Sequence, residues 1–292
     1  MSLDSVLVEE FVPLVIPVLG KEISTKELVQ IVEKTRETGI KGEFYLSETG
    51  EFRFLSEKQK YDLVDFVSTI RQKDVQVIVG TTFDSVRTTV KFTQYAQAKR
   101  FDAFVLVPQY QTGMPPIEFV RCVLDHSDMP LVIYNNPWIS NGRNFDTGDL
   151  AVLVDQYGER IKGVKDSSAD LDCFKQLAWV RDNIATWLMV YQGSEEALIA
   201  NPEFHMENAD GIVSGTANFS PRLIKRVWRK IKGGHFDELA IDNKILEEYH
   251  ESYKRAGSSV PVIKHHLYSA GLIMSPDVMP SNPIYKSKII TK

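Results

Sequence analysis

The sequence predicts an α/β fold of the (β/α)8 TIM-barrel type with a C-terminal helical extension. Short apolar runs alternate with amphipathic stretches of helical length. The unit repeats about every 25 to 35 residues, the span of a strand and its crossover helix. Several runs are almost continuously apolar, as expected for parallel strands that are covered on both faces. We expect the barrel over residues 1–233 and the extension, packed on the barrel, over residues 234–292.

Eight apolar runs are strand candidates, and eight strands close a barrel of this type. The alternative is an open doubly wound sheet, but no GxGxxG or GxxxxGK[ST] motif follows an early strand. The barrel is therefore favoured. The candidates are FVPLVIP (11–17), GEFYL (42–46), VQVIV (75–79), AFVLV (103–107), LVIY (131–134), IKGVK (161–165), WLMVY (187–191) and GIVSG (211–215).

The helices between these strands have marked ends. Residues 24–27 (STKE) and 56–59 (SEKQ) each have the pattern of a capping box ahead of apolar residues at helical spacing. Ser220 and Pro221 predict a helix start with proline at the first helical position, and Gly233 predicts its end. The stretches 235–256 and 260–271 form the predicted helices of the extension.

Composition excludes several classes of function. The formal net charge is −5, and Lys and Arg are scattered, so we expect no nucleic-acid and no membrane partner. No apolar run approaches the roughly 20 residues that span a bilayer, and no signal peptide is recognised. Cys122 and Cys173 are isolated, which favours a reducing, cytoplasmic location. The adjacent His265 and His266 point to different faces of a helix, so we expect no metal site.

Lys165 is the most informative single residue. It ends the sixth apolar run, where a barrel enzyme places its chemistry at the carboxyl ends of the strands. Removing an amine from water favours its neutral form, which can add to a ketone and form a Schiff base. The alternative is a lysine whose ammonium reaches solvent or pairs with the neighbouring Asp166.

Two tyrosines and one loop follow other strands at the same end of the barrel. Tyr134 ends the fifth run and Tyr110 follows the fourth, so a phenol-based proton relay near Lys165 is one interpretation. The other is a pair of ordinary half-buried tyrosines. The loop LSETGEF places Thr49 and Gly50 after the second run, where a hydroxyl and backbone N–H groups can hold a carboxylate. A plain connecting loop is the alternative.

Nearly the whole chain resembles the dihydrodipicolinate synthase and N-acetylneuraminate lyase family of Schiff-base class I lyases. The resemblance is carried by the order and spacing of several motifs. LSETGEFRFLS resembles the family's GTTGE-type loop, and VIYNNP resembles its YNxP motif. GVKDSS is similar to the family's G-[IVL]-K motif, and ADGIVSGTANFSP to its eighth-strand segment.

The resemblance implies a role for each matching residue. Lys165 forms the imine with the keto carbon of pyruvate or another 2-oxo acid, and Tyr134 moves the proton while a carbon–carbon bond is made or broken. Thr49 holds the carboxylate with its hydroxyl and, like Gly50, with its backbone. Tyr110 matches the tyrosine that reaches across a tight dimer, and Val213 matches the apolar residue beside the imine. The resemblance also implies a homotetramer (a dimer of dimers) without metal or organic cofactor, and an aldehyde as second substrate.

Two departures from the family pattern bear on the substrate. Glu48 stands where the loop normally has a hydroxyl that joins the two tyrosines, and its charge would repel a substrate carboxylate unless it turns away, is protonated or pairs with a cation. Ile139 replaces the synthase's arginine for its second substrate, so a true dihydrodipicolinate synthase is not expected. The function predicted is a 2-oxo acid aldolase. The alternatives are a dehydratase of deoxy-keto-sugar acids that uses the same imine, and an inactive family member that binds a 2-oxo acid as a sensor.

Overall fold

The computed structural model of the protein describes residues 6–110 and 113–279. Its strands form a closed barrel in the order β1-β10-β9-β8-β7-β6-β5-β4, so the predicted (β/α)8 fold class is confirmed. A short antiparallel hairpin of β2 and β3, which the apolar pattern did not predict, lies outside the barrel order. The strands are β1 (Glu10–Pro13), β2 (Val18–Leu19), β3 (Glu22–Ile23), β4 (Gly42–Tyr45), β5 (Gln76–Gly80), β6 (Ala103–Leu106), β7 (Leu131–Asn135), β8 (Ile161–Asp166), β9 (Met189–Gln192) and β10 (Gly211–Val213).

Each of the eight predicted runs overlaps one barrel strand, but the bounds of run and strand differ by a few residues. The first run extends to residue 17, whereas β1 ends at Pro13. The strand ends there because the N–H of Val15 donates to the side chain of Asn218 (Oδ1, 3.0 Å) and not to a neighbouring strand. Leu14 and Ile16 are still fully buried. These residues are therefore hydrophobic because they lie in the core, and not because they belong to the strand.

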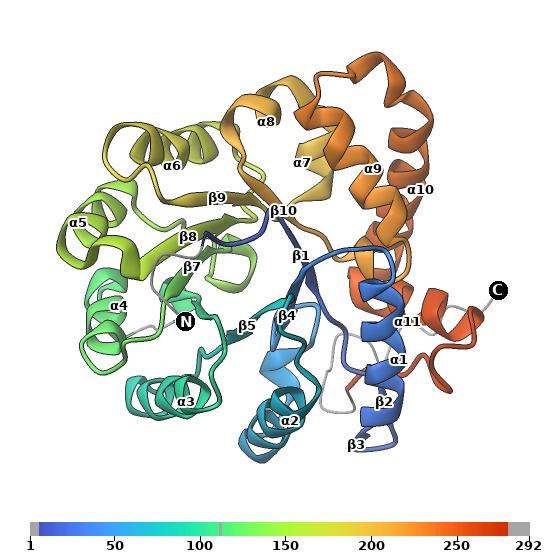
Figure 1. Ribbon diagram of the computed structural model, residues 1–292, viewed down its shortest axis with the longest axis horizontal. Helices are drawn as coiled ribbons and strands as arrows, with labels where there is room; N and C mark the ends of the chain where they lie inside the picture. The colour runs from blue at the N-terminus through green and yellow to red at the C-terminus, as the bar shows by residue number, and fades with distance from the viewer. Residues whose placement is uncertain (1–5, 111–112, 280–292) are drawn as a thin grey trace. The chain divides into compact units, whose positions relative to one another are not determined.

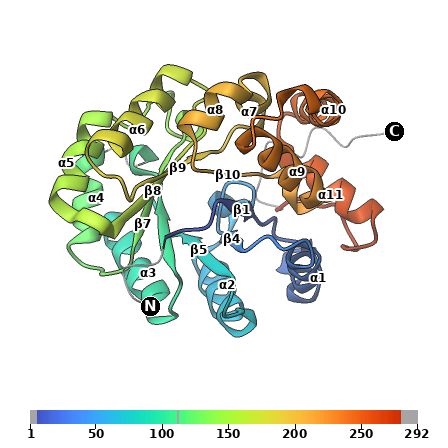
Figure 2. The same cartoon turned by 45° about the horizontal axis from the view of Figure 1, so that its top comes forward.

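The chain forms two compact units. The first consists of Met1–Glu9 with Gln76–Val213. In this unit β5 to β10 run parallel, and Figures 1 and 2 show α4, α5 and α6 along one side of β7, β8 and β9. Its helices are α3 (Val86–Ala98), α4 (Pro116–Leu124), α5 (Thr147–Tyr157), α6 (Leu171–Asn183), α7 (Glu195–Ala200) and α8 (Pro202–Asn208), with short 3-10 turns η2 (Pro108–Tyr110), η3 (Pro137–Ile139) and η4 (Gly158–Arg160).

The second unit consists of Glu10–Val75 with Ser214–Lys292. After η6, α10 packs against both α9 and α11, seen as the orange and red helices of Figure 1. A separate extension that begins at residue 234 stays a prediction. In the described part of the chain, no helix is long and apolar enough to cross a membrane. The elements are α1 (Thr25–Arg36), α2 (Glu57–Ile70), α9 (Pro221–Lys232), α10 (Ala240–Ala256) and α11 (Ser259–Ser269), with η1 (Phe52–Phe54), η5 (Thr216–Asn218) and η6 (Phe236–Glu238).

One of the two predicted capping boxes forms and the other does not. At the start of α2, the Ser56 hydroxyl accepts from the N–H of Gln59, and the Gln59 side chain accepts from the N–H of Ser56. At the start of α1, the Ser24 side chain makes no capping bond. The prediction for residues 24–27 was wrong because Glu27 is buried and accepts a hydrogen bond from the N–H of Met274 at 3.0 Å. A long-range partner thus replaced the local one. Pro221 and Gly233 mark the ends of α9 as predicted.

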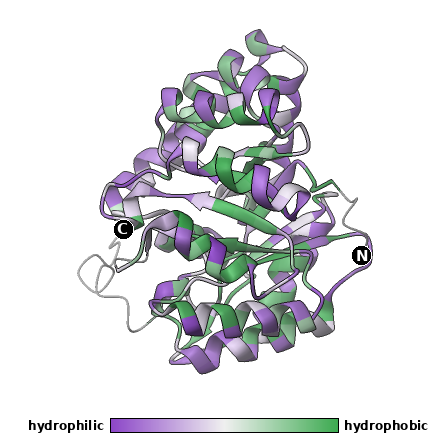
Figure 3. Ribbon diagram, turned by 90° about the vertical axis from the view of Figure 1, so that its left-hand side faces the viewer, coloured by the Kyte–Doolittle hydropathy of each residue, from purple (hydrophilic) through white to green (hydrophobic). Residues whose placement is uncertain are grey.

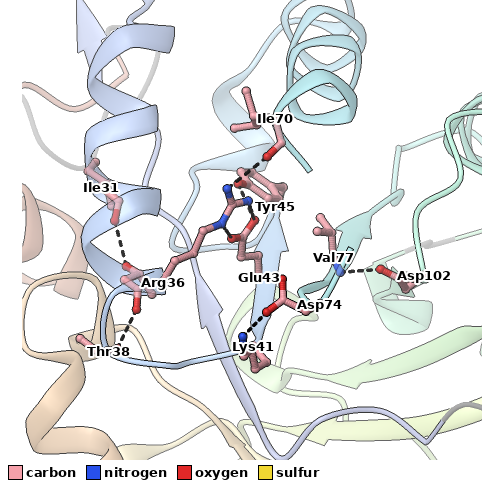
Figure 4. A network of polar contacts seen from close by, with 11 residues as sticks. Ile31, Arg36, Thr38, Lys41, Glu43, Tyr45, Ile70, Asp74, Val77 and Asp102 are labelled. Carbon is pink, nitrogen blue, oxygen red and sulfur yellow. Dashed lines mark hydrogen bonds and ion pairs between the residues drawn. The ribbon is translucent and has the colours of Figure 1, made fainter. Parts of the chain in front are cut away.

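Within the second unit, an ion pair between the partly exposed Arg36 and the buried Glu43 joins α1 to β4. Figure 4 shows the Arg36 guanidinium directed at the Glu43 carboxylate, with Nε–Oε1 and Nη2–Oε2 distances of 2.6 and 3.1 Å. The Tyr45 hydroxyl donates to the same carboxylate at 2.9 Å, and Arg36 also donates to the carbonyl of Ile70 at the end of α2. Burial and the nearby Glu43 raise the pKa of Tyr45 well above its ordinary value. This pair fixes α1 and α2 against one strand.

The strands are mostly apolar and the helices are amphipathic, as Figure 3 shows by the mainly green strands and the mixed green and purple helices. Every residue of β7 and of β8 is buried. Polar residues in these strands therefore need partners, because a buried polar group without a hydrogen bond costs about 1–3 kcal/mol.

A fully buried ion pair ties α11 and residues 277–279 to the loop after β4. Lys264 on α11 donates to Glu51 Oε2 at 2.6 Å, and their side chains are 0% and 1% exposed. Lys264 also donates to the carbonyl of Asp277, and Glu51 Oε1 accepts from the N–H of Met279. Burial lowers the pKa of Lys264, and the Glu51 charge opposes that shift. The pair is therefore completed by backbone groups of residues 277 and 279.

Replacing Lys264 by alanine is expected to lower the free energy of unfolding by about 3–5 kcal/mol, because Glu51 would stay buried without its cation. Urea denaturation followed by circular dichroism measures the loss. Lys254→Ala is the matched control: Lys254 pairs with Glu251 on the surface, and its loss should change stability by less than about 0.5 kcal/mol. Equal effects of the two substitutions would contradict a special role for the buried pair.

Candidate active site

The register of β7 and β8 sets Tyr134 beside Lys165. The strands run parallel and pair Tyr134 with Lys165 and Asn135 with Asp166. Lys165 is the last residue but one of β8, because the strand continues to Asp166, one residue beyond the predicted end. Since side chains alternate along a strand, Tyr134 and Lys165 share one face of the sheet, while Asn135 and Asp166 share the other.

The Lys165 amine is buried against the Tyr134 ring. Its Nζ lies 3.8 Å from the ring centroid, and the residue is only 6% exposed. The alternative of a lysine that reaches solvent is therefore wrong. Burial against the ring limits the positions that this amine can take.

On the opposite face, Asp166 lies in a buried hydrogen-bond network. Its Oδ1 accepts from Asn135 Nδ2 at 2.6 Å and its Oδ2 accepts from the Ser168 hydroxyl at 2.8 Å. Asn135 also donates to Asn144 and accepts from the N–H of Phe145, so the network reaches the loop after η3. Burial raises the pKa of Asp166 to about 6, although these hydrogen bonds favour the charged form. The network locks the carboxyl ends of β7 and β8 together.

The Tyr134 hydroxyl has two polar neighbours. Asn136 Nδ2 donates to it at 2.8 Å, and the Ser167 hydroxyl lies 3.4 Å from it. Asn136 is the variable position of the YNNP motif, and Ser167 follows β8 directly. The backbone of Ser167 is held by its N–H bond to the carbonyl of Asn135 at 2.9 Å. Both residues directly follow the paired strands β7 and β8.

Gly193, which follows β9, leaves room for the lysine side chain. A Cβ built on Gly193 would lie 2.7 Å from Lys165 Cε and 2.2 Å from the Ser167 hydroxyl. Its N–H donates to the carbonyl of Asp166 at 2.7 Å, which brings the backbones together. Any side chain at this position would displace Lys165 or Ser167, because both lie so close to the backbone of Gly193. The position therefore requires glycine.

In the second unit, the loop after β4 is a compact turn that carries Thr49. The N–H of Gly50 donates to the Ser47 hydroxyl at 3.0 Å, and the N–H of Glu51 donates to the carbonyl of Glu48 at 2.9 Å. A Cβ on Gly50 would lie 2.9 Å from the carbonyl of Leu14, so the turn has no space for a side chain there. Thr49 itself is half-buried.

Glu48 forms an ion pair with Arg53 in the same loop. The contact is bidentate, with Arg53 Nη2–Glu48 Oε1 at 2.7 Å and Arg53 Nε–Glu48 Oε2 at 3.2 Å. About a third of each side chain is exposed. Of the three conditions under which Glu48 can tolerate a carboxylate, the structure shows the pairing with a cation. The charge of Glu48 is therefore compensated locally.

The remaining predicted residues lie near the carboxyl ends of three other strands or turns. Tyr110 is the half-buried last residue of η2, and Val213 is the buried last residue of β10. Ile139 ends η3 and is half-buried, beside Trp138, which is 80% exposed. Their roles stay predictions.

Neither cysteine nor the titratable clusters indicate other chemistry in the described residues. Groups of three or more His, Cys, Asp or Glu side chains that could hold a metal ion are absent from residues 6–110 and 113–279. Cys122 and Cys173 are free thiols. Burial, with the charges of Asp166 and Asp170, raises the pKa of the Cys173 thiol to about 12, so it is not a reactive thiolate.

The family follows from the comparison with known proteins. The model of the dihydrodipicolinate synthetase family matches residues 11–289. The chain belongs to this family. Membership confirms the resemblance seen in the motifs and the assignment of the protein to the lyases.

Relatives within the dihydrodipicolinate synthetase family include several aldolases. The chain is 24% identical, over 86% of its length and 82% of the relative's, to the probable 2-dehydro-3-deoxy-D-pentonate aldolase YjhH of Escherichia coli. It is 28% identical to the 2-dehydro-3-deoxy-D-gluconate/2-dehydro-3-deoxy-phosphogluconate aldolase of Picrophilus torridus, over 68% of this chain and 71% of that one. The fold is similar to that of E. coli YagE, solved in complex with pyruvate, with a TM-score of 0.85, 21% identity and coverage of 96% and 94% of the two chains.

Sequence reasoning missed several residues of the site. Asn136 and Ser167 lie inside recognised motifs, but nothing in their spacing indicates that both face the Tyr134 hydroxyl. Arg53 was not considered as the partner of Glu48, although a basic residue five positions later in a tight loop is a usable signal. Gly193 was not missed: the segment that begins with it follows the seventh predicted strand, where a small residue near Lys165 is one interpretation.

The raised pKa of Asp166 predicts a pH-dependent difference in stability between the wild type and Asp166→Asn. The pKa is about 6 in the folded protein against an ordinary value of 3.8, so only the native state keeps the proton between these values. The stability that this proton contributes is present below pH 4 and is lost as the pH rises through 6, by about 3 kcal/mol. Asp166→Asn should therefore gain stability relative to the wild type over this range.

Urea denaturation of both proteins from pH 4 to pH 7.5 measures the difference. Asp172→Asn, an exposed position in the first turn of α6, is the control and should show less than about 0.5 kcal/mol of change. A constant difference between wild type and Asp166→Asn across the pH range would rule out a buried, proton-binding Asp166.

Proposed function

We propose that this protein is a class I aldolase that joins Lys165 to the keto carbon of pyruvate or another 2-oxo acid and makes or breaks a carbon–carbon bond to an aldehyde. The observation that carries the proposal is the buried Lys165 amine, 3.8 Å from the centre of the Tyr134 ring, in a member of a Schiff-base lyase family. A buried amine fixed beside a phenol has the groups that imine chemistry needs, namely a nucleophile and a proton carrier.

The proposed reaction balances without another reagent. The neutral amine of Lys165 adds to the keto carbon, and water leaves as the imine forms. Loss of a proton from C3 gives an enamine, and its C3 attacks the carbonyl carbon of the aldehyde. Hydrolysis of the imine then returns Lys165 and releases the product. In this scheme Tyr134 carries the proton, and Tyr110 completes the relay from a partner subunit.

The carboxylate of the 2-oxo acid is proposed to bind to Thr49 and to the backbone of the loop at Gly50. The support is the match of this loop to the family's GTTGE-type loop and its tight turn, in which Thr49 is half-buried. Val213 is proposed as the apolar neighbour of the imine. Because Arg53 compensates the charge of Glu48, the loop keeps the ability to bind an anion.

The proposed substrate is a 3-deoxy-2-oxo acid that carries hydroxyl groups. The support comes from the aldolase relatives, which are named for 2-dehydro-3-deoxy sugar acids. Ile139 argues against a true dihydrodipicolinate synthase, since it cannot form the charge-assisted contact to a second carboxylate. A dehydratase that uses the same imine is less favoured, and the Glu48–Arg53 pair removes the main argument for an inactive sensor.

The proposal includes a cytoplasmic homo-oligomer, with a dimer of dimers as the expected form. Two isolated free cysteines support the cytoplasm, where thiols stay reduced. The support for a dimer is the match of Tyr110, at the end of η2, to the family's tyrosine that reaches across a tight dimer.

Borohydride reduction in the presence of pyruvate is expected to leave a stable adduct on Lys165, because hydride converts the imine to a secondary amine. Intact-mass and peptide mass spectrometry locate the adduct. Lys165→Ala should show no adduct and no turnover, whereas Lys162→Ala, which removes the other lysine of β8, should keep both. An adduct elsewhere, or turnover by Lys165→Ala, would contradict the proposed nucleophile.

The charges of Glu48 and Arg53 are expected to act on pyruvate affinity in opposite directions. Arg53→Ala leaves Glu48 uncompensated and should weaken pyruvate binding about 3- to 10-fold, because the pair is partly screened by solvent. Glu48→Thr removes the negative charge and should strengthen binding. The double variant should return to near the wild-type value.

The dependence of adduct formation on pyruvate concentration gives the affinity of each variant. The circular dichroism spectrum serves as a control for folding. If Arg53→Ala and Glu48→Thr both leave the affinity unchanged, the pair does not face the bound carboxylate.

A further inference from the structure

Asn136 occupies a position that a connecting turn does not require to be polar. It is the residue between the Asn and the Pro of the YNNP motif and is only 4% exposed. Its Nδ2 donates to the Tyr134 hydroxyl at 2.8 Å, which is well within hydrogen-bond range. Burying an amide is costly unless its polar atoms are bonded, so this contact needs an explanation beyond packing.

The other end of the same amide is unsatisfied. Asn136 Oδ1 is buried and accepts no hydrogen bond from the residues that the structure describes. An asparagine that served the fold alone would satisfy both ends, as Asn135 does with Asp166 and the N–H of Phe145. The amide of Asn136 instead bonds to the hydroxyl of the phenol that faces Lys165. The orientation of the amide is therefore fixed by its bond to Tyr134, and not by a contact within the turn.

Asn136 is the nearer of the two side chains that bond to the Tyr134 hydroxyl. Asn136 is 2.8 Å away, whereas Ser167 lies at a weaker 3.4 Å.

We propose that Asn136 is the positioning residue that holds the Tyr134 hydroxyl in place for proton transfer. The inference rests on the proposed imine chemistry of Lys165. As a donor to the phenol oxygen, Asn136 holds the hydroxyl at a fixed point beside Lys165, so that its proton can be directed to the reacting carbon. The amide acts through Tyr134 and does not itself exchange a proton.

The exchange of the C3 protons of pyruvate with D2O tests this role without knowledge of the aldehyde. Each exchange needs the imine, the enamine and one proton carrier, and the decay of the methyl signal in the NMR spectrum gives its rate. Asn136→Leu, similar in size, should slow exchange about 10- to 100-fold at saturating pyruvate, because the hydroxyl loses its alignment. The pyruvate concentration for half-maximal rate and the borohydride adduct on Lys165 should stay near the wild-type values.

A double-mutant cycle distinguishes a role through Tyr134 from a general disturbance. Tyr134→Phe should slow exchange by about 100-fold or more, and Asn136→Leu added to it should change the rate less than about twofold. Ser167→Ala tests the weaker contact and should slow exchange less than Asn136→Leu. Asn136→Ala provides a second variant if Asn136→Leu does not fold, and Asn183→Leu on the surface of α6 is the matched control.

The outcomes separate this inference from the proposed function. If the wild type forms no adduct with pyruvate, the proposed function fails and this inference fails with it. If the adduct forms but the Asn136 variants exchange at the wild-type rate, only this inference is overturned. The same holds if Asn136→Leu slows exchange by an equal factor in the wild-type and Tyr134→Phe proteins, because the amide would then act independently of the phenol.

Discussion

The hydrogen-bonded pairing of β7 with β8 is the constraint on which the candidate site depends. It sets Tyr134 opposite Lys165 on one face and Asn135 opposite Asp166 on the other. The outer face is closed by the 2.6 Å hydrogen bond between Asn135 and Asp166, so the inner pair is held at a fixed separation. A shift of one residue would exchange the two faces and place the lysine among the helices. One register therefore determines both the Tyr134–Lys165 pair and the hydrogen bond on the opposite face.

The two faces of these strands carry different kinds of polarity. On the outer face, Asp166 is buried with a pKa raised to about 6, and it is stabilised by hydrogen bonds rather than by a cation. On the inner face, the amine of Lys165 contacts an aromatic ring. Neighbours in sequence thus belong to separate networks, since adjacent strand residues point in opposite directions. The Asp166 carboxylate bonds to Asn135 and Ser168, on the face opposite Lys165.

In the second unit, long-range polar contacts support the loop that carries Thr49. Glu51 has a φ of 56°, in the left-handed region that costs a residue other than glycine about 1–3 kcal/mol. Its carboxylate binds Lys264 and the N–H of Met279, so the C-terminal segment holds this conformation. Glu48 and Arg53 then neutralise each other on the more exposed side of the same loop. The buried Lys264–Glu51 pair therefore fixes the backbone of the loop, and the partly exposed Glu48–Arg53 pair compensates its remaining charge.

The sequence by itself determined the barrel, the family and the central pair of residues. The eight apolar runs, the lysine at the end of the sixth and the YNNP motif are local patterns, and parallel strands convert them directly into a closed sheet with Lys165 and Tyr134 at its carboxyl end. Tertiary structure decided which polar atoms meet. Glu27 bonds to the N–H of Met274, Lys264 to Glu51, and Asn136 to the Tyr134 hydroxyl. Which of the many donors and acceptors meet depends on side-chain direction and on long-range packing. The spacing of residues along the chain indicates only the periodicity of strands and helices.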